Sequence, residues 1–136
     1  MAANAPYSPP HTDGIARFDL PKEIAGAEAR KPWASGVHSK TLVKQADIRV
    51  VLVMMESGAR MDEHHADGSV SVQVLRGAIR LRAGKETEEL RKDQILTMPP
   101  SVPHDVEAIE PSVYLLTLSW PESDKLKRMP HRGYGS

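Results

Sequence analysis

The sequence predicts a single all-β domain in which two sheets close into a barrel. From Thr41 onward, branched apolar residues recur in short runs that are separated by turn residues at regular intervals, which is typical of sandwiches and barrels. The chain has 136 residues and no cysteine, so it is long enough for one hydrophobic core and has no disulfides to stabilise it. No repeat with a period of about 20 to 50 residues occurs, which excludes a solenoid or propeller.

The composition of the chain limits the kinds of partner that we expect it to bind. The 18 basic and 18 acidic side chains balance to a formal net charge of zero and are interspersed, so we expect no nucleic-acid partner. The longest apolar run, Val50 to Met55, is too short to cross a bilayer, and no basic start precedes an apolar stretch. We therefore expect no membrane partner and a cytoplasmic location.

The N-terminal part divides into a tail and a helix. Residues 1–14 are rich in proline and polar residues and are expected to form a flexible tail. From Asp19 to Arg30, an early Pro21 and an acidic Glu23 are followed by good helix formers, which predicts a short helix that Pro32 ends. We assign residues 15–120 to the helix and barrel, and residues 121–136 to a C-terminal arm or tail.

Nine segments have the composition of strands. Gly84 and Lys85 separate two of them, which predicts a tight hairpin. The second arm of that hairpin is charged at nearly every position, as expected of a solvated or edge strand. The nine segments are Thr41 to Lys44, Ile48 to Glu56, Met61 to His65, Val70 to Leu75, Ala78 to Ala83, Glu86 to Arg91, Gln94 to Met98, His104 to Ile109 and Ser112 to Trp120.

Three of the six histidines lie in the predicted strands. His11 and His131 fall in the tails, and we expect His38 to lie in a loop after Gly36. His64, His65 and His104 remain as candidates for a functional site.

The segment around His64 resembles the first motif of the cupin superfamily. That motif is Gly, five residues, His-x-His, three or four residues, Glu, six residues, Gly. Gly58, His64 and Gly77 match it in register. Ala66 stands at the position of the second His, and Val70 stands at the position of the Glu.

The segment around His104 resembles the second cupin motif, which is Gly, five residues, Pro-x-Gly, two residues, His, three residues, Asn. Pro99 and His104 match. Asp93 and Ser101 replace the two glycines, and Ala108 replaces the Asn.

The resemblance covers about residues 41–120 and implies a jelly-roll β-barrel, a homodimer and an interior site where the two motifs meet. His64 and His104 would then be the metal ligands, with His65 as a tentative third ligand if a β-bulge turns it inward. The metal would be Fe, Mn, Zn or Ni. Gln73 has the wrong strand parity to join them, whereas Met61 and Met98 are placed to line a ligand pocket beside the histidines.

Three functions remain open at this point. The first is the binding of a small molecule inside the barrel, without an assigned reaction, which the replacement of two of the four cupin ligands favours. The second is a metal-dependent enzyme of the dioxygenase, isomerase or lyase type that uses His64 and His104. The third is a structural domain whose pocket is inactive.

Overall fold

A computed structural model describes residues 14–64 and 66–119 of the chain. This described part is mostly β structure with one short α-helix, as predicted. In chain order the elements are α1 (Leu20–Glu28), a 3-10 turn (Ala34–Gly36), β1 (Val37–Lys44), β2 (Ile48–Met55), β3 (Arg60–His64), β4 (Val70–Arg76), β5 (Ala78–Ala83), β6 (Glu86–Arg91), β7 (Ile95–Met98), β8 (His104–Ala108) and β9 (Ser112–Ser119).

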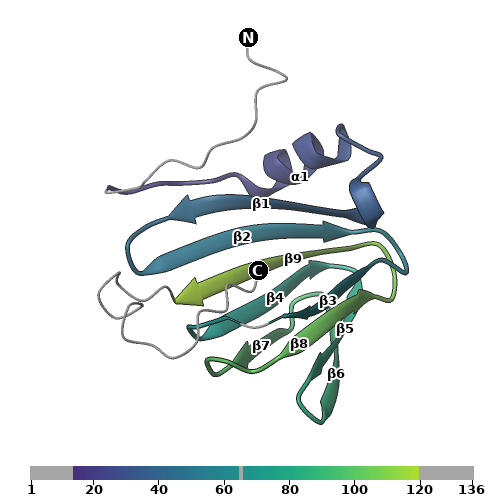
Figure 1. The fold of residues 1–136 in the computed structure, drawn as a ribbon. Coiled ribbons are helices and arrows are strands. Elements are labelled where there is room, and N and C mark those ends of the chain that lie inside the picture. Colours follow the sequence, from purple (N-terminus) through teal and green to yellow (C-terminus); the bar gives the residue numbers. More distant parts are fainter. Residues whose placement is uncertain (1–13, 65, 120–136) are drawn as a thin grey trace.

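The strands form two antiparallel sheets that face each other (Figure 1). One sheet has the strand order β1-β2-β9-β4-β7, and the other has the order β3-β8-β5-β6. Apolar side chains from both sheets meet in one buried cluster between them. The predicted jelly-roll barrel is therefore confirmed.

The five-stranded sheet is covered on both faces along β2. On β2, Val53 and Met55 belong to the cluster inside the barrel. The alternate residues Leu52 and Met54 belong to a second buried cluster beneath α1. Because the part of β2 that is covered on both sides has no solvent-facing positions, its residues from Val50 to Met55 are all apolar rather than alternating.

Helix α1 lies across the outer face of β1 and β2 (Figure 1). Asp19 caps its first turn by accepting a hydrogen bond from the amide of Lys22 at 3.1 Å. The buried residues Ile24 and Ala27 face the sheet, and the indole Nε1 of Trp33 donates to the carbonyl of Ala27 at 2.9 Å. This hydrogen bond ties the chain after the helix to the helix itself. In the described residues, no helix is long and apolar enough to span a membrane.

The first strand is longer than the sequence indicates, and His38 lies within it. Strand β1 begins at Val37 rather than Thr41, because its early residues pair with the end of β2, with His38 opposite Met54. The expectation that His38 lies in a loop is therefore wrong. Most of the predicted tail (1–13), the predicted arm at 121–136 and Trp120 lie outside the described residues.

The predicted hairpin at Gly84 and Lys85 is confirmed, since it joins β5 to β6. Strand β6 forms one edge of the four-stranded sheet, and only Leu90 on it is buried. Its charged side chains therefore lie on an exposed edge, as expected of a strand that must avoid further pairing.

The turns of the two cupin motifs keep their backbone geometry even where the glycine is lost. Gly77 has a φ of 79°, and a Cβ at this position would overlap the carbonyl of Pro111. Asp93 and Ser101, which stand at the glycine positions of the second motif, have φ values of 71° and 66°. Because L-residues adopt this conformation at a cost, the fold retains turns for which glycine is the better residue.

Candidate functional site

His104 is the first residue of β8 and is buried inside the barrel. Its Nδ1 lies 3.0 Å from the carbonyl oxygen of Val102. A carbonyl can only accept, so Nδ1 carries the proton in this bond, and in the neutral form of the ring the lone pair is on Nε2. The turn before β8 thus selects the tautomer of His104.

His64 is aligned with His104 by the pairing of β3 with β8. The register runs from Arg60 opposite Glu107 and Met61 opposite Val106 to His64 opposite His104, with an irregularity between Met61 and His64. Three residues on β3 therefore span two on β8, which is a bulge of one extra residue.

The bulge changes which residues of β3 share a face. Without it, position 64 would lie on the opposite face from Met61, because the two positions are three apart and faces alternate. The structure describes the backbone of His64 but not its side chain, and His65 lies outside the described residues. The predicted roles of both side chains therefore stay predictions.

A small cavity lies inside the barrel next to His104. It measures about 10 Å³ and is lined by Met61, Val72, Leu81, His104, Val106, Tyr114 and Leu116. Met61 and His104 therefore line the same cavity, and the predicted role of Met61 in ligand binding stays a prediction. Met98 is buried in the same core but lies opposite Val70 on a different pair of strands.

Tyr114 is a polar residue of this interior that the sequence analysis missed. It is 1% exposed, and its hydroxyl lies 3.2 Å from Sδ of Met61 and 3.5 Å from Sδ of Met55. Burial raises the pKa of Tyr114 well above its usual value, so the hydroxyl stays protonated. The available signal was its place on an inward-facing position of the last strand, where a tyrosine brings a polar group into an apolar core.

Comparison with models of known protein families identifies the family of this chain. The profile of the AraC-like ligand binding domain matches residues 53–125, which is more than half of the chain. The chain belongs to this family. A comparison with curated protein sequences found no significant match.

Solved structures with the same fold as this AraC-like domain include several cupins. A conserved protein of unknown function from Streptococcus pyogenes has 24% identity and a TM-score of 0.66, covering 88% of this chain and 100% of its own. A cupin superfamily protein from Desulfitobacterium hafniense has 16% identity and a TM-score of 0.63, covering 69% and 86%. Salicylate 1,2-dioxygenase from Pseudoaminobacter salicylatoxidans, in a structure with gentisate, has 18% identity and a TM-score of 0.61, covering 80% of this chain and 31% of its own. The domain thus has the cupin fold that its motifs predicted.

Two of the four cupin ligand positions of this AraC-like domain cannot bind a metal. At the two motif positions where cupins carry a second His and a Glu, Ala66 and Val70 are buried in the barrel core. Neither side chain can bind a metal, and transition metals in proteins usually have three or four protein ligands. Among the described residues, no group of three or more His, Asp or Glu side chains could hold a metal ion.

Two polar residues near the motifs lie away from the interior. Gln73 is exposed, as its strand parity predicts. Arg60 is exposed and lies opposite Glu107 on the outer side of the small sheet. Arg80 and Arg82 of the same sheet form ion pairs with acidic residues of neighbouring strands, so the outer face of this sheet carries a network of paired charges.

Proposed function

We propose that this domain binds a small molecule inside the barrel, at the end where β3 pairs with β8. The observation that carries the proposal is the orientation of His104. Its Nδ1–H is engaged by the Val102 carbonyl at 3.0 Å, and the ring lines the interior cavity. A buried imidazole held in one tautomer is a specific hydrogen-bonding group for a ligand.

The strand register supports a role for His64 in the same site. His64 lies directly opposite His104 in an antiparallel pair, and residues in that relation project to the same face of a sheet. The backbone register therefore places positions 64 and 104 side by side on adjacent strands, within reach of one ligand.

The ligand needs more room than the cavity offers. A volume of about 10 Å³ holds roughly one water molecule, whereas ligand pockets are usually about 300–1,000 Å³. Met61 is the side chain best suited to move, because it is half-buried, flexible and unbranched. Its displacement would also free the Tyr114 hydroxyl, which thioether sulfur holds only weakly. The ligand we propose is therefore mainly apolar and carries one or two hydrogen-bonding groups.

The test uses methionine methyl groups as reporters in the full chain. Salicylate and gentisate are the first probes, since they are named with a structural neighbour that shares the fold. With ¹³C-methyl methionine, we expect either probe to shift the signals of Met61 and Met55. Met54 is the internal control, because it is adjacent to Met55 in sequence but packs beneath α1 on the other side of the sheet.

His104→Ala is the variant that distinguishes specific binding from general association. We expect it to abolish the Met61 shift, while His38→Ala, outside the barrel, leaves the shift unchanged. Absence of a Met61 shift with both probes, or a Met61 shift that is unaffected by His104→Ala, would contradict the proposal.

A metal-dependent activity is the second candidate, and one contact favours it. A histidine that ligates a metal usually donates its other ring N–H to a carbonyl or carboxylate, as Nδ1 of His104 does. This candidate requires His64 and a further ligand such as His65. Elemental analysis of the purified protein at neutral pH tests it, with a His64→Ala, His104→Ala double variant as control. Near one metal per chain, absent from the variant, would favour the enzyme, and no metal in either would exclude it.

The homodimer implied by the cupin resemblance remains a proposal, and sedimentation of the full chain at several concentrations tests it. A constant monomer mass would contradict it.

A further inference from the structure

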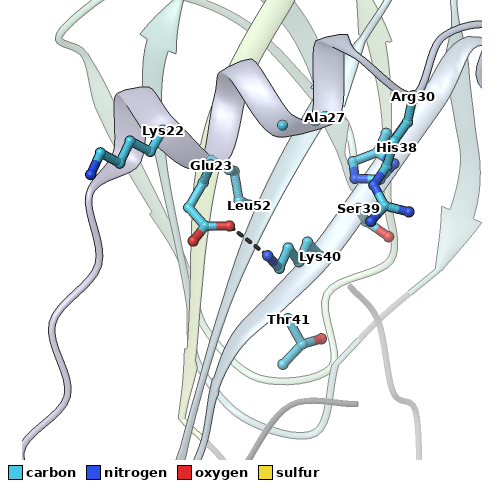
Figure 2. Close-up of a pocket in the computed structure, with 10 residues that line it drawn as sticks. Lys22, Glu23, Ala27, Arg30, His38, Ser39, Lys40, Thr41 and Leu52 are labelled. Carbon is cyan, nitrogen blue, oxygen red and sulfur yellow. Dashed lines mark hydrogen bonds and ion pairs between the residues drawn. The ribbon is translucent and has the colours of Figure 1, made fainter. Parts of the chain in front are cut away.

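A second, larger cavity lies outside the barrel, between helix α1 and strand β1. It measures about 430 Å³, forty times the interior cavity, and falls in the size range of small-molecule sites. Figure 2 shows its layout, with the helix on one side and the strand on the other. Its apolar surface comes from Gly26, Ala27 and Leu52.

The polar side chains of this groove are mainly basic. Lys40 crosses from β1 to Glu23 on the helix, with its Nζ 2.6 Å from a carboxylate oxygen (Figure 2). Arg30, just beyond the end of the helix, extends its guanidinium towards His38 and Ser39. Within residues 14–64 and 66–119, Arg30 forms no ion pair. One carboxylate therefore faces two nearby cations, and the His38 end of the groove carries excess positive charge.

The pKa of His38 reflects this excess positive charge. Partial burial lowers the pKa of His38, and the positive charges of Arg30 and Lys40 lower it further. The third neighbour is Trp33, whose ring centroid lies 5.8 Å from that of His38. His38 is therefore a neutral hydrogen-bonding group between two cations, a setting that an anion would stabilise.

We propose that the groove between α1 and β1 binds a small organic acid, with its carboxylate between Arg30 and Lys40 beside His38 and its apolar part against Ala27. Arginine suits this role because its planar guanidinium can donate two parallel hydrogen bonds to one carboxylate. Lysine has three donors and can bind the acid while it keeps Glu23. The site is separate from the barrel interior and does not depend on the function proposed there.

The experiment follows the histidine ring protons of the full chain by NMR across a pH titration, with the His38 signal assigned from a His38→Gln variant. Hexanoate is the probe, inorganic phosphate tests for a simple anion site, and 1-hexanol tests for apolar binding alone. We expect hexanoate to raise the pKa of His38, because a bound carboxylate favours the protonated ring. We expect phosphate to bind more weakly than hexanoate and hexanol to have no effect on this pKa.

Two variants test which charges matter. Arg30→Gln removes an exposed cation and should weaken hexanoate binding by about tenfold, as expected for the loss of a charge-assisted hydrogen bond. Lys85→Gln, at the tip of the β5–β6 hairpin, removes the same charge elsewhere and should leave binding unchanged. His104→Ala should also leave it unchanged, which separates this site from the barrel interior.

Several results would overturn the proposal. They are an unchanged His38 pKa with hexanoate, phosphate binding as tight as hexanoate binding, the same effect from hexanol, or equal losses in Arg30→Gln and Lys85→Gln.

Discussion

Two buried hydroxyl groups on β9 should respond in opposite ways to deletion. Ser112 is 3% exposed, and its Oγ accepts from the Ala78 amide at 3.0 Å and lies within hydrogen-bonding distance of the carbonyl oxygens of Glu110 and Ala78. Tyr114, two residues later, is equally buried, but within the described part of the chain its hydroxyl has only thioether sulfurs as acceptors. The two groups therefore share a strand and a degree of burial but differ in the strength of their partners.

The expected magnitudes follow from those partners. Ser112→Ala leaves the Ala78 amide without this acceptor, and an unsatisfied buried group costs about 1–3 kcal/mol. Tyr114→Phe removes a hydroxyl whose burial without a good partner costs about 1–3 kcal/mol, and a weak sulfur acceptor offsets only part of that cost. We expect the free energy of unfolding to fall by about 2 kcal/mol in Ser112→Ala and to rise by about 0.5–1 kcal/mol in Tyr114→Phe.

Urea unfolding of the two variants and the wild type checks the prediction. The slope of unfolding free energy against urea should be the same in all three, so that the midpoints report stability. Tyr114→Leu is a packing control, because it removes the ring and should cost about 3 kcal/mol through cavity formation. A loss of more than about 1 kcal/mol in Tyr114→Phe would refute the reasoning, since it would mean that the hydroxyl forms a strong hydrogen bond.

Four further outcomes are expected. In thermal melts, Gly77→Ala should lower the free energy of unfolding by more than about 2 kcal/mol, because the positive φ and the overlap of the new Cβ with the Pro111 carbonyl both destabilise the folded state. Gly84 also has a positive φ but has open space around it, so Gly84→Ala should lower the free energy of unfolding by only about 1 kcal/mol. Ser101→Gly should be neutral or gain up to about 1 kcal/mol in urea unfolding, because relief of the positive φ exceeds the entropy cost of glycine. The pKa of His38 is lower in the folded protein than its value of 6.5 in the unfolded chain. The stabilisation linked to the neutral ring is therefore fully present above pH 6.5 and is lost as the pH falls towards the pKa of the folded protein. His38→Gln should therefore flatten the pH dependence of stability below pH 6.5, and an unchanged slope would contradict this assignment.

Much of the site could be located from spacing alone. His104 was identifiable as a candidate because it lies five residues after Pro99 in a segment that resembles a cupin motif, and in the structure it is buried and lines a cavity with Met61. The spacing could not show that the Val102 carbonyl selects its tautomer, because that contact depends on the path of the turn. Nor could it show that the interior is almost filled, since the cavity volume depends on how Tyr114 and the methionines pack.

The groove between α1 and β1 had no signature in the sequence. Arg30 and His38 are separated by Trp33 and a turn, and neither belongs to a recognisable motif. They become neighbours only because α1 packs on the outer face of β1, and because β1 extends back to Val37 through its pairing with β2.

The sequence by itself determined the class of fold, the positions of the strands and the two cupin motifs, because apolar periodicity, turn residues and motif spacing are local properties. Tertiary structure alone decided which side chains share a space. The pairing of β3 with β8 introduces a one-residue bulge that sets His64 opposite His104, and a shift of one residue reverses every face of a strand. Register, packing volume and the docking of a helix depend on contacts between distant segments, and no local pattern encodes them.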